Sequence, residues 1–409
     1  MYDVIVCGAG PAGSVAATVL ARGGARVLLL ERARFPRDKL CGDTINPGAL
    51  AILRRLGLAA SFESSGLPVD GMIVTGEHAV SVRCAYGGGA RGLAIVRRDL
   101  DAALARAASA AGARLEEEVL VRGPLVDERG HDVRVRGVII AGPDGRDIRI
   151  PAPIVIAADG RRSRLALPLG LARHPPRPRR WAIGAYFDGV SGVTSFGEMH
   201  VRRGCYIGLA PVPSGLTNVC VVVGGRREDG KLATGNRQRV TGNGQRVTGN
   251  RQPGTARQQS PATVINDAIA RDAQLRERFT GARMVGEPSV LGPLAVDAER
   301  CGVLGLLLAG DAAGFIDPMT GDGLRFAIRG GELAALAALA AFAGDPTLPH
   351  ERLAQDRRRE FAGKWRFNRT LRRLVGRSVT VELAGLAARA APWLLRRTIA
   401  FAGDVPGAP

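Results

Sequence analysis

The stretch Gly8-Ala9-Gly10-Pro11-Ala12-Gly13 decides the fold, because it joins an apolar, strand-like run at 4–7 to a helix-like run at 12–22. A second strand-like run at 26–31 follows and ends in the carboxylate of Glu31. Strand, glycine turn, helix and strand in this order predict a βαβ unit of about 30 residues that binds a dinucleotide.

Each glycine of this turn has its own expected role. Gly8 permits the tight turn, Gly10 lets the backbone approach a pyrophosphate, and Gly13 lets the helix pack closely on the strand. Glu31 stands near the expected spacing of about 20 residues after the glycines, where a carboxylate accepts the ribose hydroxyls of an adenosine. A glycine-rich turn without a ligand is the alternative, and the accompanying strands, helix and acid argue against it.

Two later stretches carry similar turns after apolar runs. Asp159-Gly160 follows the run at 154–157, and Gly310-Asp311 follows the run at 302–309. Together with the N-terminal turn they resemble the three FAD motifs of the flavoprotein superfamily that holds aromatic hydroxylases, geranylgeranyl reductases and flavin-dependent halogenases. The resemblance implies FAD as the cofactor, with Asp311 on the ribityl hydroxyls and with Asp159 and Gly160 beside the pyrophosphate.

Within that superfamily the chain is most similar to the geranylgeranyl reductases. The loop at 35–42, which contains Cys41-Gly42, resembles the loop that these enzymes lay along the isoalloxazine ring, while a plain surface loop with an inert thiol is the alternative. The turn at 320–323 resembles their T-G-[DE]-G pattern. Arg97 matches an arginine for which the family implies contact with the flavin phosphates, and a solvated arginine at a helix start is the alternative.

A partial match concerns the substrate. Tyr206-Ile207-Gly208-Leu209-Ala210-Pro211 stands where geranylgeranyl reductases carry Y-x-W-x-F-P, so that Tyr206 and Pro211 are predicted to bind the substrate. Gly208 and Ala210 replace the two aromatic residues of the pattern. A wider pocket than a polyprenyl chain requires is therefore expected, with a bulkier or ring-containing substrate.

The predicted cofactor site collects the residues of these motifs. Its members are Gly8, Gly10, Ala12, Gly13, Glu31, Arg32, Cys41, Gly42, Arg97, Asp159, Gly160, Gly310, Asp311, Gly321 and Gly323. No constellation of His, Cys or acidic residues identifies a catalytic proton donor, so the catalytic residue is unknown. No cysteine or histidine spacing predicts a metal site.

The predicted fold class is α/β, with a Rossmann-like FAD-binding domain of the aromatic-hydroxylase type, an inserted antiparallel β-sheet substrate domain and a helical C-terminal tail. The assigned boundaries are 1–68, 97–172 and 300–345 for the discontinuous FAD-binding domain, 69–96 and 173–299 for the substrate domain, and 346–409 for the tail. A seven-residue repeat at 234–252 is interpreted as a low-complexity insertion.

Composition limits the partners. The formal net charge is +19, but the chain has only three lysines among its basic residues, a pattern typical of a GC-rich coding bias, and it lacks the motifs of nucleic-acid binding proteins, so nucleic acid is not an expected partner. Six cysteines without paired spacing predict a reducing compartment, and we expect a cytoplasmic protein with no signal peptide. No apolar run approaches the roughly 18 residues of a membrane span.

The tail at 350–409 is arginine-rich and contains Trp365, Trp393 and Leu394-Leu395. One interpretation is peripheral membrane contact through the C-terminal helices. Packing across the substrate domain is the favoured interpretation, since alanine and arginine dominate the composition. Nothing in the sequence indicates the oligomeric state.

The resemblance implies an FAD-dependent oxidoreductase. NAD(P)H is expected as a transient co-substrate that reduces the flavin, because a second dinucleotide fingerprint is absent, and an apolar, isoprenoid-like or polyketide-like double bond is then reduced. A class A type monooxygenase that hydroxylates an aromatic or polyketide substrate has the same fold and is the first alternative. A non-catalytic flavin-binding protein is the second.

Overall fold

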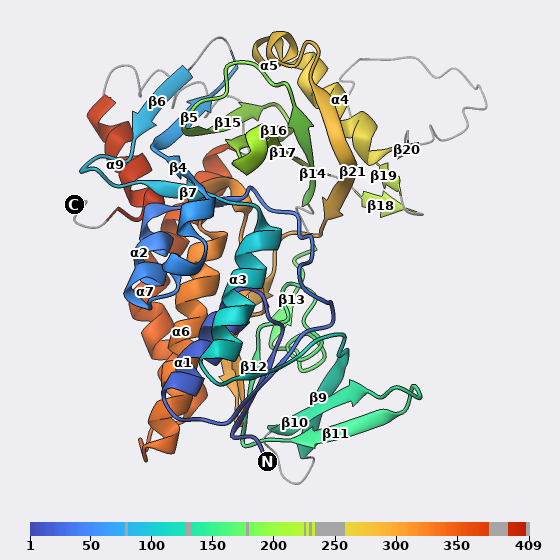
Figure 1. Cartoon of the computed structure of the whole chain (residues 1–409), viewed down its shortest axis with the longest axis vertical. Coiled ribbons are helices and arrows are strands. Elements are labelled where there is room, and N and C mark those ends of the chain that lie inside the picture. Colours follow the sequence, from blue (N-terminus) through green and yellow to red (C-terminus); the bar gives the residue numbers. More distant parts are fainter. Residues whose placement is uncertain are drawn as a thin grey trace, which may run out of the picture.

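The computed structural model describes residues 1–77, 81–127, 133–176, 180–224, 226–228, 231–233, 258–375 and 392–405. The repeat predicted at 234–252 lies outside these residues. In Figure 1 a large β-sheet occupies the upper part of the molecule, and a group of helices beside a second sheet occupies the lower part.

The lower sheet has six strands in the order β23-β24-β12-β1-β2-β8. They are β1 (Val4–Cys7), β2 (Val27–Leu30), β8 (Arg114–Glu116), β12 (Ile154–Ala157), β23 (Gly302–Val303) and β24 (Leu306–Leu308). All neighbouring pairs are parallel except the edge pair β23 and β24. This arrangement confirms the predicted Rossmann-like fold class.

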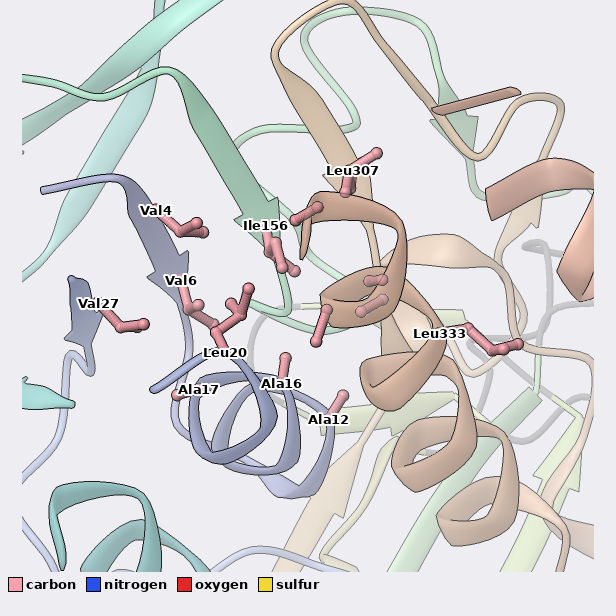
Figure 2. Packing of buried hydrophobic residues seen from close by; sticks show 14 of the residues in the cluster. Val4, Val6, Ala12, Ala16, Ala17, Leu20, Val27, Ile156, Leu307 and Leu333 are labelled. Carbon is pink, nitrogen blue, oxygen red and sulfur yellow. The ribbon is translucent and has the colours of Figure 1, made fainter. Parts of the chain in front are cut away.

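Both faces of this sheet are covered. Val4 and Val6 of β1 pack with helices α1 (Pro11–Arg22) and α6 (Gly323–Phe342), as Figure 2 shows for Val4, Val6 and the α1 residues. Ile5 and Cys7 pack on the opposite side, against a three-stranded sheet. That sheet consists of β9 (Val121–Asp127), β10 (Arg134–Ala141) and β11 (Asp147–Pro151). Strands buried on both faces are apolar throughout, which is why β1 lacks an alternating pattern.

Helix α1 lies directly against α6, because glycine and alanine form the contact. A Cβ atom on Gly331 would lie 2.2 Å from the carbonyl oxygen of Ala12. Helix α3 (Arg97–Ala110) contributes Ala108 to the same core, and α2 (Pro47–Arg55) packs on α6. The close packing brings Gly331, eight residues into α6, to the N-terminal end of α1.

The upper sheet has seven strands in the order β21-β14-β17-β16-β15-β5-β6. They are β5 (Gly71–Thr75), β6 (Ser81–Ala85), β14 (Arg180–Asp188), β15 (Phe196–Arg202), β16 (Cys205–Pro211), β17 (Thr217–Gly224) and β21 (Arg283–Leu291). The pair β5 and β15 is parallel, so the sheet predicted as antiparallel is mixed at this one place. Long chain segments separate β5 from β15, and a parallel pair requires such a crossover.

The two faces of the upper sheet have different neighbours. Helices α4 (Pro261–Arg271) and α5 (Ala273–Arg278) cover one face, where Ile207, Val219 and Val221 are buried against them. The other face lies toward the cavity described below.

Three short sheets accompany the larger ones in the described residues. In one of them β7 (Gly92–Ala94) lies between β3 (Thr44–Ile45) and β4 (Leu67–Val69), and thus connects segments on both sides of the predicted boundary at 68. In another, β13 (Ala172–Arg173) pairs with β22 (Asp297–Ala298). A third is formed by β18 (Arg226–Glu228), β19 (Lys231–Ala233) and β20 (Gln258–Gln259).

The C-terminal region is helical, as predicted. Helix α7 (Pro349–Val375) packs on α6, and α9 (Pro392–Gly403) lies beside β6 (Figure 1). Ile399 of α9 is buried with Val69 and Cys84, so α9 packs on the β-sheet lobe while α7 packs on α6. None of the helices in the described ranges has the length and apolarity needed to cross a bilayer.

Candidate cofactor and substrate site

The three glycines of the first turn have three different surroundings. Gly8 has a φ of +96°, and a Cβ atom there would lie 2.5 Å from the carbonyl oxygen of Ala158. A Cβ atom on Gly13 would lie 1.8 Å from the carbonyl oxygen of Gly8. On Gly10 the nearest heavy atom would be the Nη2 of Arg37, at 3.8 Å. Gly8 and Gly13 are therefore needed by the chain itself, whereas Gly10 keeps space open at the start of α1.

Glu31 supports this turn through its carboxylate. Its Oε2 accepts a hydrogen bond from the backbone N–H of Ala9 at 2.9 Å, and its Oε1 accepts one from Ala33 at 3.2 Å. Arg37 lies 3.5 Å from Glu31 and 3.1 Å from Asp101, so its guanidinium bridges the two acids. The contact of Glu31 with a ribose stays a prediction.

A cavity of about 440 Å³ extends from the glycine turn to the upper sheet. The predicted cofactor residues that line it are Gly10, Ala12, Cys41, Gly42, Arg97, Gly160, Gly310, Asp311, Gly321 and Gly323. The lining does not include the other predicted cofactor residues Gly8, Gly13, Glu31, Arg32 and Asp159. Arg32 is exposed. Sequence motifs more than 300 residues apart thus meet at one site.

Several buried polar atoms around the turn have no hydrogen-bond partner within the described chain. They are Nε of Arg37, Oδ1 of Asp159 and Nε of Arg161. Burial lowers the pKa of Arg161 to about 10, and burial together with the nearby Arg97 lowers the pKa of Lys39, which also lines the cavity. Burying positive charge without a partner is unfavourable, so Lys39 and Arg161 fit an anionic ligand such as a dinucleotide.

Arg97 is buried, with 6% of its surface exposed, so the alternative of a solvated arginine is wrong. Its Nε and Nη2 donate to the two carboxylate oxygens of Asp101 at 2.8 and 2.9 Å. This bidentate pair on α3 holds the guanidinium at the cavity wall. Its contact with a phosphate stays a prediction.

Asp43 attaches the loop at 39–43 to the upper sheet. Its Oδ2 accepts hydrogen bonds from the hydroxyl of Tyr186 at 2.7 Å and from Nδ2 of Asn218 at 2.6 Å, and its Oδ1 accepts one from the backbone N–H of Arg97 at 3.1 Å. Burial raises the pKa of Asp43 to about 6. We call this arrangement the Asp43 latch. The sequence analysis did not identify it, because its partners lie 143 and 175 residues further along the chain.

Asp317 attaches a second loop to the same sheet. Its Oδ1 accepts from the hydroxyl of Tyr206 at 2.6 Å, and its Oδ2 accepts from Nη1 of Arg180 at 2.8 Å. The backbone N–H of Met319 also donates to Oδ1, at 3.2 Å. Burial raises the pKa of Tyr206 well above its ordinary value. In this second arrangement, the Asp317 latch, the phenol of Tyr206 is a structural donor and its ring lines the cavity.

The upper sheet forms an apolar wall of the cavity. Alternate residues of β16 face the cavity and line it, namely Tyr206, Gly208 and Ala210. A Cβ atom on Gly208 would have no neighbour nearer than 3.9 Å. The wall is therefore open where the reductase pattern has its tryptophan. Pro211, the other residue predicted to bind substrate, is not part of the lining.

Helix α9 closes the far end of the cavity with Thr398, Ile399, Ala402 and Gly403. Nζ of Lys364 on α7 donates to the carbonyl oxygens of Phe401 and Ala402 and, at 3.2 Å, to Oδ1 of Asp322. Asp322 stands between the two cavity-lining glycines of the turn before α6. One buried ammonium group thus connects α9 with that turn.

A parallel α/β lobe with a dinucleotide turn, joined through one cavity to a β-sheet wall, defines a two-lobed FAD flavoprotein. The chain belongs to the FAD binding domain family, whose model matches residues 1–345. Its cofactor is FAD.

Named relatives include two reductases. The chain is 30% identical to menaquinone reductase of Mycolicibacterium smegmatis, over 81% of this chain and 75% of that protein. It is 29% identical to digeranylgeranylglycerophospholipid reductase of Methanosarcina mazei, over 84% of this chain and 77% of that protein. The second match confirms the resemblance to geranylgeranyl reductases.

Another relative has a different description. The chain is 31% identical to conditioned medium factor receptor 1 of Dictyostelium discoideum, over 86% of this chain but only 66% of that protein, slightly less than two thirds of its length. Among solved structures, a flavoprotein/dehydrogenase from Cytophaga hutchinsonii superposes with a TM-score of 0.79 at 21% identity, over 98% of this chain and 93% of that one. This likeness shows the shared fold.

Proposed function

We propose that this chain is an FAD-dependent oxidoreductase that uses NAD(P)H to reduce a double bond in an apolar, isoprenoid-like or polyketide-like substrate. The observation that carries the proposal is the single cavity that leads from the space over Gly10 to the apolar wall of the upper sheet. The two reductases among the relatives support the same chemistry. Bound FAD would supply the hydride chemistry, which protein side chains lack.

The residues of the chain then have positioning roles. Met72, Val74, Met199 and Val222 line the substrate end and exclude water from it. The Asp43 and Asp317 latches hold the loops at 39–43 and 315–319 against this wall, so that both sides of the cavity keep a fixed separation. A hydride and a solvent proton add across the double bond, and the product is two mass units heavier.

A monooxygenase is the second candidate, and the open wall at Gly208 and Ala210 favours it because it admits a ring. The test incubates the FAD-loaded protein with NADPH or NADH and either a menaquinone or a geranylgeranylated glycerol ether lipid, in parallel reactions without and with oxygen. A gain of two mass units that persists after reoxidation in air supports the reductase, because a quinone ring reduced to a quinol also gains two units but loses them again in air. A gain of sixteen that needs oxygen replaces it with the monooxygenase, and no NAD(P)H consumption with any substrate supports a non-catalytic flavin binder.

The partners belong to the same proposal. The substrate is a small apolar organic molecule, and nucleic acid is not proposed as a partner. Peripheral membrane contact through the C-terminal helices is a further proposal, supported by the exposure of Trp393, which shows 61% of its surface on α9. The cytoplasmic localisation stays a prediction.

A further inference from the structure

Asn218 is a polar residue on an otherwise apolar part of the cavity wall. In β17 it lines the cavity together with Cys220 and Val222, while the alternating residues Val219 and Val221 are buried under α4. Because side chains of a strand alternate between its faces, the amide of Asn218 lies on the cavity side. Only 4% of the surface of the residue is accessible.

The hydrogen bonds of Asn218 fix which atom of the amide is free. Nδ2 donates to the carbonyl oxygen of Cys41 at 3.0 Å and to Oδ2 of Asp43 at 2.6 Å, which uses both N–H groups. Both partners are acceptors, so the amide cannot be reversed without losing these bonds. Oδ1 receives no hydrogen bond from any described residue. Unlike the fully buried polar atoms without a partner, it keeps some accessible surface. It is an acceptor available from the cavity.

The wall beside Asn218 is lined by small residues. Its cross-strand neighbour is Ala210, and Gly208 is the neighbour of Cys220, so two consecutive pairs on this face carry small residues. Strand β14 lies on the other side of β17, and its residue opposite Cys220 is Gly184. Leu40 fills the space over Gly184, since its Cδ1 would lie 2.2 Å from a Cβ atom there. The free space therefore lies over Gly208 and Ala210.

We infer that Asn218 selects a substrate that carries a hydroxyl group on a flat ring, which lies over Gly208 and Ala210 and donates its hydrogen bond to Asn218 Oδ1. An apolar extension of the substrate would continue toward Ile399 of α9. The inference rests on the proposed function only in placing the organic substrate in this cavity. A site built around an acceptor rejects ligands that cannot donate to it, because the acceptor is then left unpaired.

The test measures binding without turnover. FAD-loaded protein is titrated with 2-naphthol and with 2-methylnaphthalene, two rings of similar size of which only the first donates a hydrogen bond, and the change in the flavin absorption band gives each dissociation constant. The variants are Asn218→Ala and, for comparison, Tyr186→Phe, which removes another bond to Asp43 and keeps the asparagine at 218.

We expect Asn218→Ala to lower the preference for 2-naphthol over 2-methylnaphthalene about tenfold or more, and Tyr186→Phe to keep it within about threefold. An unchanged preference in Asn218→Ala, an equal loss in both variants, or no binding of either ring would overturn the inference. Loss of FAD from Asn218→Ala with an unchanged preference would assign Oδ1 to the flavin instead. Absence of NAD(P)H-dependent reduction would refute the proposed function and leave this binding result intact.

Discussion

Gly10 and Gly13 are three residues apart, yet a side chain at each would have opposite effects. The nearest atom to a Cβ on Gly10 is 3.8 Å away, whereas a Cβ on Gly13 would clash with the Gly8 carbonyl oxygen at 1.8 Å. We expect Gly10→Val to fold with a melting temperature of the apoprotein near the wild-type value but to lose FAD. Gly13→Ala should destabilise the apoprotein itself. Flavin absorbance per protein and thermal unfolding distinguish the two, and full flavin content in Gly10→Val would contradict the site.

Asp43 gives stability a dependence on pH. Burial raises its pKa from 3.8 to about 6 in the folded chain. The folded state therefore binds the proton more tightly than the unfolded state, and the contribution of Asp43 to stability is complete below pH 4 and is lost as the pH rises through 6. About two pKa units correspond to about 3 kcal/mol.

We expect Asp43→Asn to flatten the fall in unfolding free energy of the apoprotein between about pH 4 and 7, measured by urea denaturation. Asp38→Asn is the control, because that side chain lies in the same loop with 78% of its surface exposed. Equal slopes in the wild type and in Asp43→Asn would show that Asp43 does not titrate in this range.

Single residues differ in how far the sequence reveals them. Gly8, Gly10 and Gly13 were predicted with their separate roles, because a turn between a strand and a helix imposes local constraints. Asp43 and Asn218 were missed, since their meaning depends on a contact between residues 175 positions apart. An asparagine within an apolar strand is the local signal that could have directed attention to Asn218.

At the scale of elements, α9 depends on one buried lysine. Lys364 is 4% exposed, and its ammonium group has three acceptors, two of them at the C-terminal end of α9. We expect Lys364→Met to lower stability by about 3 kcal/mol, because Asp322 then loses a buried partner. Hydrogen exchange in 392–403 should increase more than in the rest of the chain. Arg366→Met, exposed on the same helix, is the control, and unchanged exchange in α9 would refute the role of Lys364.

The β16 wall yields a second prediction at this scale. A Cβ atom at Gly208 has no neighbour nearer than 3.9 Å, so we expect Gly208→Trp to fold and to fill the space that the missing aromatic leaves. We expect this variant to bind 2-naphthol at least about tenfold more weakly, because an overfilled site excludes the ring. The melting temperature and FAD content should stay close to wild type. Unchanged naphthol affinity would place the ring elsewhere.

The sequence predicted the helices and strands better than it predicted which of them lie side by side. Parallel strands such as β1 and β12 follow from their fully apolar composition. The parallel pairing of β5 with β15 was not predicted, since strand order in a sheet depends on how distant segments meet. The same limit applies to α9, whose composition indicated a helix but not its place at the end of the cavity.

At the scale of the whole molecule, residues of both lobes line the cavity, and the cofactor of the chain is FAD. Because FAD binds the folded chain and not the unfolded one, it should raise the melting temperature of the apoprotein. A free concentration of FAD about 100 times the dissociation constant contributes about 2.7 kcal/mol. For a chain of this length that corresponds to a shift of several degrees. Gly10→Val should show no shift in the same thermal scan, and an equal shift in both proteins would contradict FAD binding over Gly10.

The two latches also determine how long a flavin stays. Cys41, Phe315 and Met319 line the cavity in loops that the Asp43 and Asp317 latches hold to the same sheet. We expect a flavin held under these loops to depart only when at least one loop separates from that sheet, and buried carboxylates with several donors should make such openings rare. Dwell time is therefore governed by the opening frequency of the protein rather than by the affinity of the glycine turn, and such a protein would retain its yellow colour through extensive dilution.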